Sequence, residues 1–191
     1  FDNSLSGVMF SCLIAIILAS AYCLVGACWL IIKCEGTLQE KAVKWAQYHL
    51  INSVIGLAVI SLATPLISDR IFDKWLSFPA LLWLSPIPII TGLLIIWLYF
   101  LLKHMPLDKD RLNYLPLLIT IGIYTFSFCG LAYSFFPYIV PEQMTIIEAS
   151  AAPESLKIML VGTLIVLPIL LSYSALSYYI FRGKATDLSY D

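Results

Sequence analysis

The stretch Tyr22–Glu40, YCLVGACWLIIKCEGTLQE, decides the fold that we predict for this chain. Its first half ends an apolar run that is long enough to cross a bilayer, and its second half carries Lys33, Glu35 and Glu40. The whole chain of 191 residues is 61% hydrophobic and only 12% charged, whereas a soluble domain has about 25% charged residues. This composition leaves too little polar surface to cover a globule, so we predict an integral membrane protein.

Five apolar runs reach the length of about 20 residues that a spanning helix needs. They cover residues 5–32, 48–67, 81–102, 115–136 and 156–181. The runs lack the alternation of polar and apolar residues that is typical of membrane β-barrel strands. We therefore predict an all-α integral membrane protein, with residues 1–191 forming a single transmembrane domain, a bundle of five helices. Residues 137–155 form its outer loop, and Pro79, Pro86 and Pro88 predict a kink in the first half of the third helix.

The basic residues predict the orientation, because eight of the eleven fall on one side of the predicted membrane. These eight are Lys33, Lys41, Lys44, Lys103, Lys109, Arg111, Arg182 and Lys184. Arg70, Lys74 and Lys157 fall on the other side. The excess of positive charge on cytoplasmic loops then places the C-terminus in the cytoplasm and the loop 137–155 outside. We expect a multi-pass protein of the bacterial cytoplasmic (inner) membrane.

Ionisable residues inside a membrane usually mark a functional site. No Asp, Glu, Lys or Arg lies deep in any of the five runs, but His49 follows Lys44 by five residues, about 7–8 Å along the helix. It is either an interfacial histidine or a contact for a proton path or a quinone. Glu148 in the outer loop is a candidate for the same role, because the loop offers it no evident structural part. Tyr178 in the last run is another, although hydroxyl groups inside helices more often bond across helices.

Cofactor sites are harder to find in this sequence. A haem needs an axial ligand such as histidine, and His49 and His104 are the two histidines present, the second of them in a loop. The five cysteines form no CxxC pair, so we expect them to act as small packing residues. We predict no haem, no metal and no catalytic residue in this chain, and its net charge of −1 argues against a nucleic-acid partner.

Small side chains recur at every fourth position of the first run. They are Ser11, Ala15, Ala19, Cys23 and Ala27. In a helix of 3.6 residues per turn, a period of four drifts by about 40° at each step, so this small-residue seam winds gently around the helix. Seams of this kind allow two helices to pack closely in lipid. We predict a packing surface against this chain or a partner, with chance recurrence of common residues as the alternative.

Four blocks of the sequence resemble, in the same order, subunit II of cytochrome bd-type quinol oxidases, particularly the cyanide-insensitive branch. They are GACWLIIKCEGTLQ, KWLSFPALLWLSPIP, IVPEQMTIIEASAAPESLKIMLVG and SYYIFRGK. The residues that match the pattern of the family are Gly26, Trp29, Leu30, Lys33, Glu35, Gly36, Glu148, Ala149, Pro153, Arg182, Gly183 and Lys184. The chain departs from the pattern at Cys34, where the family has threonine, and at Ile147, where an aromatic residue usually precedes the acid.

The resemblance implies a membrane heterodimer that oxidises quinol, of the ubiquinol type, and reduces dioxygen to water as a terminal oxidase of aerobic respiration. The haems belong to subunit I, so this chain resembles the haem-free partner, which supports assembly and gives access to protons or quinone. Its implied partners are subunit I, membrane lipid and the quinone pool. Subunit II of the family has about nine spanning helices, so the five runs look like its C-terminal part. The residues alone leave two alternatives, half of a small-solute permease and a purely structural anchor.

Overall fold

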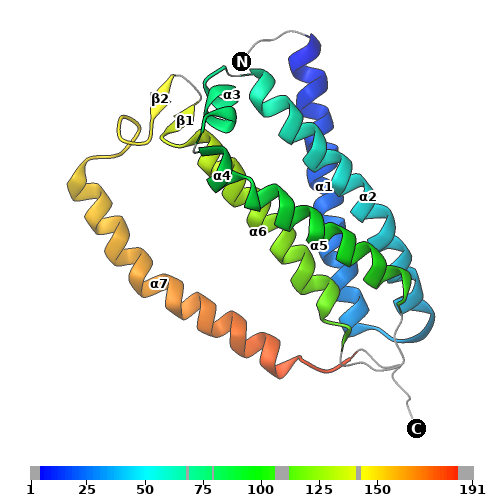
Figure 1. The fold of residues 1–191 in the computed structure, drawn as a ribbon. Coiled ribbons are helices and arrows are strands. Elements are labelled where there is room, and N and C mark those ends of the chain that lie inside the picture. Colours follow the sequence, from blue (N-terminus) through cyan, green and yellow to red (C-terminus); the bar gives the residue numbers. More distant parts are fainter. Residues whose placement is uncertain (1–4, 68, 79, 106–111, 141–142, 185–191) are drawn as a thin grey trace. The chain divides into compact units, whose positions relative to one another are not determined.

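The structure is a computed structural model that describes residues 5–67, 69–78, 80–105, 112–140 and 143–184. These residues fall into two compact units, the first ending at Ser134 and the second comprising Phe135–Lys184. The first unit contains α1 (Leu5–Lys33), α2 (Gly36–Ile67), α3 (Asp69–Leu76), α4 (Ala80–Leu84), α5 (Pro86–Lys103) and nearly all of α6 (Leu115–Phe135), as Figure 1 shows. The second contains β1 (Tyr138–Val140), β2 (Met144–Thr145) and α7 (Pro153–Ile180).

Five of the helices are long and apolar enough to cross a membrane: α1, α2, α5, α6 and α7. The prediction of an all-α membrane protein with five transmembrane helices is therefore confirmed. That residues 1–191 form a single domain stays a prediction. Lys109 and Arg111, which contributed to the predicted orientation, lie outside the described residues.

The helices differ from the predicted runs mainly at two places. The second helix begins at Gly36 rather than at residue 48, because the polar segment from Glu40 to Gln47 continues the helix beyond its apolar part. Gly36 has a φ of +59°, a left-handed conformation that favours glycine and turns the chain between the two helices. The third run is divided at Ser85 into α4 and α5, as its prolines predicted.

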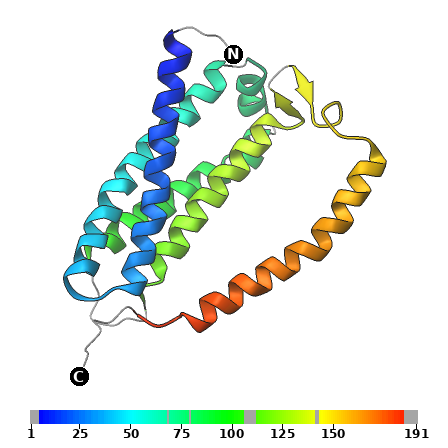
Figure 2. The same ribbon diagram turned by 180° about the vertical axis from the view of Figure 1, so that it is seen from behind.

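The α1–α2 hairpin is the centre of the first unit. Its two helices are joined by Cys34 and Glu35 alone, so they run antiparallel and side by side (Figure 1). A continuous buried core lies between them and extends to α5 and α6; its α1 members are Leu24, Ala27, Cys28 and Ile31. Figure 2 shows α6 alongside α1 on the other side of this hairpin. In lipid, close packing and hydrogen bonds hold such helices together in place of a hydrophobic driving force.

Two glutamines of α2 tie its beginning to the neighbouring helices. The Gln39 Nε2 group donates to the Ile31 carbonyl oxygen of α1 at 2.9 Å, and the Gln47 Nε2 group donates to the Leu102 carbonyl oxygen of α5 at 2.8 Å. Each bond satisfies a carbonyl near the C-terminal end of a helix, where intrahelical partners run out. The hairpin end, the end of α5 and the start of α2 therefore meet at one end of the unit, which carries Lys33, Lys41, Lys44 and Lys103.

The closest approach within the hairpin is at Gly56. The Ile17 side chain of α1 occupies the position that a Cβ atom on Gly56 of α2 would take. A glycine is required there because any larger residue would push the two helices apart or displace the branched side chain of Ile17.

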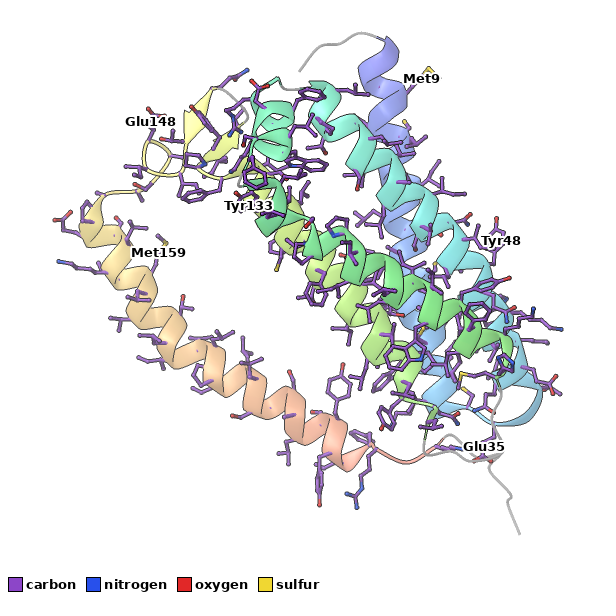
Figure 3. The ribbon with its side chains drawn as sticks, viewed as in Figure 1. Met9, Glu35, Tyr48, Tyr133, Glu148 and Met159 are labelled. Atoms are coloured by element: carbon purple, nitrogen blue, oxygen red, sulfur yellow. The ribbon has the colours of Figure 1, made fainter. Side chains whose placement is uncertain are left out.

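The opposite end of the first unit is closed by α3, a short helix that the apolar runs did not predict. Its Ile71 side chain is buried, and the Trp75 Nε1–H group donates to the Ser134 hydroxyl of α6 at 2.9 Å. The Lys74 ammonium donates to the Tyr133 carbonyl oxygen at 2.7 Å and lies 4.3 Å from the centre of the Tyr133 ring. Three contacts thus fix an eight-residue helix against the end of α6, near Tyr133 in Figure 3.

The second unit is a small β-hairpin followed by the long helix α7. Tyr138 pairs with Thr145 and Val140 with Met144 in an antiparallel register. Pro153 occupies the first helical position of α7 and Glu154 lies in its first turn, where an acid is stabilised by the helix dipole. None of the residues of α7 is buried.

Candidate functional site

His49 lies in a polar cluster between α1 and α2. Its Nδ1 atom is 2.8 Å from the Ser20 hydroxyl of α1, and its ring meets the Tyr48 ring edge to face with 5.3 Å between centroids. The Ser20 side chain is buried and the histidine is half-buried. A hydrogen bond at Nδ1 fixes the ring and leaves Nε2 as the second nitrogen for proton exchange.

A second pair lies one helical turn further along α2. The Ser53 hydroxyl is 3.0 Å from the Tyr124 hydroxyl of α6, and the Tyr124 hydroxyl lies 3.4 Å from the Ala21 carbonyl oxygen of α1. Ser53 and His49 are four residues apart and share a face of α2, while Ser20 and Ala21 are neighbours on α1. Together they place an imidazole, two serine hydroxyls and a phenol along the line where α1, α2 and α6 meet.

The same line continues toward the basic end through Cys28 and Thr120. The Cys28 thiol is 3.5 Å from the Thr120 hydroxyl, which donates to the Pro116 carbonyl oxygen at 2.7 Å. Both side chains are fully buried. The hydroxyl and thiol groups of this His49 cluster, from Cys28 to Ser53, therefore form hydrogen bonds across three helices, which suits either helix association or proton passage.

His49 lies well inside α2, although only five residues beyond Lys44, the last charged residue of that helix. Counted from Lys44 it is only 7–8 Å into the helix, but α2 begins at Gly36, so His49 follows the helix start by 13 residues, about 20 Å. Its partner Ser20 is likewise 13 residues before the end of α1 at Lys33. The histidine thus faces the middle of the apolar run of α1. Sequence reasoning missed Ser20 and Tyr124 because only the packing of α1 and α6 against α2 brings them here, whereas Ser53 shares a helix face with His49 by spacing alone.

Glu148 has a local structural role in the loop before α7. Its carboxylate accepts a hydrogen bond from the Thr145 backbone N–H at 2.8 Å, and its own N–H donates to the Thr145 hydroxyl at 3.3 Å. This reciprocal pair has the pattern of a helix capping box. The backbone hydrogen bond, and then the Thr145 side chain, lower the pKa of Glu148 below its ordinary value. Figure 3 shows this residue on the loop outside any helix.

Tyr178 and the small-residue seam of α1 are exposed in this chain. The Tyr178 side chain is 65% exposed on α7. Ser11, Ala15, Ala19 and Cys23 are also exposed, and Ala27 alone in the seam is buried. The face of α1 that packs in the first unit is the one with Ser20, Leu24 and Cys28, so the seam remains a predicted surface for another protein chain.

A shallow apolar groove lies between α2 and α5. Its volume is about 350 Å³, and its walls include Ile51, Val54 and Ile55 of α2 and Ile96, Tyr99 and Phe100 of α5. The groove is at the low end of the range of about 300–1,000 Å³ that small-molecule sites occupy. It faces away from the His49 cluster, since its residues and His49 lie on different faces of α2.

The end of the first unit at α3 carries two basic residues, Arg70 and Lys74. Burial lowers the pKa of the Lys74 ammonium, and the positive charge of Arg70 lowers it further. Across the described ranges of the chain, no three His, Cys, Asp or Glu side chains come together in a way that could hold a metal ion. The His49 cluster is therefore the main candidate for function.

Comparison with models of protein families matches residues 3–181 to cytochrome bd terminal oxidase subunit II. The chain belongs to this family. A search of curated proteins found no match. The family agrees with the resemblance that the four sequence blocks carry, and with the five transmembrane helices of the structure.

Membership of the cytochrome bd oxidase subunit II family makes this chain a subunit of a terminal quinol oxidase, an oxidoreductase of the respiratory chain. Such a subunit works in a complex with another oxidase subunit. The chain is a multi-pass membrane protein by its family and its apolar helices.

Proposed function

We propose that this chain is the haem-free subunit of a ubiquinol-oxidising terminal oxidase, and that it supports assembly with the subunit that carries the haems. The observation that carries the proposal is the pairing of polar groups across α1, α2 and α6, where Ser20 bonds to His49, Cys28 to Thr120, and Ser53 to Tyr124, since such bonds hold membrane helices together.

Optical spectra test the haem-free role. The chain expressed alone should show no Soret band, whereas the complex that it forms with its partner should show the reduced-minus-oxidised spectrum of haem. The same spectrum should persist in the complex with His49→Ala. A haem band in the isolated chain, or loss of one haem from an assembled His49→Ala complex, contradicts the proposal.

A second part of the proposal assigns proton transfer to His49. Its hydrogen bond to the buried Ser20, in the middle of α1, and its partial burial are what support this role. The two ring nitrogens of an imidazole can donate and accept hydrogen bonds, and so can the hydroxyls of Ser20, Ser53 and Tyr124. A quinone contact at the same residue is the competing role.

Steady-state kinetics distinguish these two roles. If His49 carries protons, His49→Gln should lower kcat by about 10-fold or more and change its pH profile, with little effect on the KM for quinol. A raised KM with an unchanged kcat points to a quinone contact and overturns the proton role. His104→Gln is the matched control, since the His104 Nδ1 atom is bonded to the Phe100 carbonyl oxygen in the turn after α5.

The basic end of the first unit is proposed to face the bacterial cytoplasm. It carries Lys33, Lys41, Lys44 and Lys103, while Arg70 and Lys74 belong to α3 at the other end. A reporter active only in the cytoplasm should be active after Asp191, and one active only outside should be active near Gln143. The reverse pattern contradicts this orientation and the cytoplasmic C-terminus.

A further inference from the structure

The groove between α2 and α5 has apolar walls and an open side. Ile51, Val54 and Ile55 form its α2 wall, and Ile96, Tyr99 and Phe100 form the facing wall of α5. In a bilayer, such a depression on the outer surface of a helix pair is in contact with hydrocarbon chains rather than with water. The apolar walls alone do not indicate which molecule of the membrane binds in the groove.

Two lysines beyond one end of the groove indicate the chemical class of its ligand. Lys44 precedes Ile51 by seven residues and Ile55 by eleven, so it continues the same stripe of α2. Lys103 follows Tyr99 by four residues and Ile96 by seven, and so continues the stripe of α5. The bond from Gln47 Nε2 to the Leu102 carbonyl oxygen holds the two helices together between these lysines and the groove.

Both lysines are available to a ligand. Each is exposed, and neither ammonium donates a hydrogen bond to another residue in the described part of the chain. Long lysine side chains at the end of a spanning helix extend toward the polar surface of the bilayer. The two positive charges therefore stand at the level of lipid headgroups, directly beyond an apolar groove.

We propose that this groove binds an anionic phospholipid. One acyl chain lies along Ile51, Val54 and Ile55, and the phosphate lies between Lys44 and Lys103. A phospholipid matches both features, since it joins an apolar chain to a negative group at the membrane surface, and each lysine near such a surface strengthens binding to anionic lipid. The headgroup of a quinone has no negative charge, so it leaves the two lysines without a role.

Native mass spectrometry of the intact oxidase complex tests the proposal. The complex is stripped of lipid in mild detergent and titrated with phosphatidylglycerol, with phosphatidylcholine and with a long-chain quinone. The wild-type complex should bind one phosphatidylglycerol more tightly than the other two. Lys44→Gln and Lys103→Gln should each weaken this binding about fivefold, and the double variant more than tenfold.

Filling the groove gives an independent variant. Val54→Phe should prevent binding even with both lysines present, because its ring occupies the space of the acyl chain. Leu62→Phe is the matched control, as Leu62 is 69% exposed on α2 outside the groove, and Lys157→Gln of α7 is the control for loss of charge. The haem content of each complex verifies assembly, and if Val54→Phe fails to assemble, the lysine variants decide.

Four results overturn the proposal. The first is an affinity for phosphatidylglycerol that does not change in the double lysine variant. The second is equal binding of phosphatidylcholine and phosphatidylglycerol. The third is a complex that binds the quinone in place of phospholipid, which means that a quinone tail occupies the groove. A complex that binds no lipid at all also overturns the proposal, because the partner subunit then covers the groove.

Discussion

Helices α1 and α7 are nearly equal in length and both are apolar enough to span a membrane, but they differ in burial. One face of α1 is buried against α2, whereas no residue of α7 is buried. The α1–α2 pair is joined by two residues, while α7 follows a long loop with a small β-hairpin. Apolar composition thus identifies a membrane helix without specifying its neighbours, which depend on the connection and on a few small or polar residues.

A substitution at Gly56, the closest contact between α1 and α2, should cause the largest loss of stability. Gly56→Leu places a side chain where Ile17 already lies, and should destabilise the α1–α2 hairpin by about 3 kcal/mol, because overpacked cores cannot expand freely. The measurement is the yield and thermal midpoint of the purified oxidase complex. Ile17→Ala in the same chain should recover part of the loss.

Gly162→Leu makes the same change in α7. A Cβ atom at Gly162 has no neighbouring atom within 4 Å, so this variant should assemble normally. Gly92→Leu in α5, where a Cβ atom also meets nothing within 4 Å, is a second control. If Gly162→Leu is as damaging as Gly56→Leu, α7 is packed against another chain in the complete enzyme, and the contrast with α1 holds only for the isolated subunit.

A substitution in the exposed small-residue seam of α1 tests whether that helix has a second packed face. If the haem-bearing subunit covers the seam, Ala19→Leu should weaken the packing of the heterodimer by about 2 kcal/mol. The yield of intact heterodimer on native gels should then fall. Ala58→Leu on α2 is the matched control, since Ala58 is also exposed. Equal yields for both variants show that the seam is not an interface. Ile17 is unsuitable as a control because it packs at Gly56.

Two tyrosine hydroxyls, one bonded between helices and one exposed on α7, provide a finer test of the difference between the packed helices and α7. Tyr124→Phe removes the hydrogen bonds to Ser53 and to the Ala21 carbonyl oxygen, and should destabilise the complex by about 0.6 kcal/mol, the mean for bonds between membrane helices. Tyr173→Phe on α7 should have no effect, since the Tyr173 side chain is 70% exposed. The thermal midpoints of the two variants measure the difference, and equal midpoints contradict a structural role for the Tyr124 hydroxyl.

The smallest expected effect concerns the loop that leads to α7. The lowered pKa of Glu148 means that its bond to Thr145 stabilises the loop fully above the unfolded value of about 4.3, and that this contribution is lost as the pH falls through the folded value. Hydrogen exchange at the Thr145 amide, corrected for its intrinsic rate, should therefore speed up in acid. Glu148→Gln should remove this pH dependence, and a wild-type amide with constant protection contradicts the assignment.

The sequence predicted the five spanning helices because each is a continuous apolar run. It did not predict the beginning of α2, since Glu40, Lys41 and Lys44 look like the end of a membrane segment, although helical hydrogen bonds continue through them. It also missed α3, whose eight residues are too short and too polar to stand out as a membrane helix.

The candidate site was predicted only in part. His49 stands out as the ionisable residue nearest the membrane interior, and this follows from its position in the sequence alone. Ser20 and Tyr124 are 29 residues before it and 75 residues after it, and nothing in their own surroundings indicates that they approach α2. The structural role of Glu148 was also missed, although the spacing Thr145-x-x-Glu148 is the pattern of a capping box.

The two-residue turn at Cys34 and Glu35 has a consequence for biogenesis. Because it brings α1 and α2 together directly, the two helices can pair with each other before α5 and α6 have been synthesised. The hydrogen-bond partner of the Ser53 hydroxyl, Tyr124, is synthesised 71 residues later. The hydrogen bonds between α2 and α6 can therefore form only after both helices of the hairpin have been synthesised.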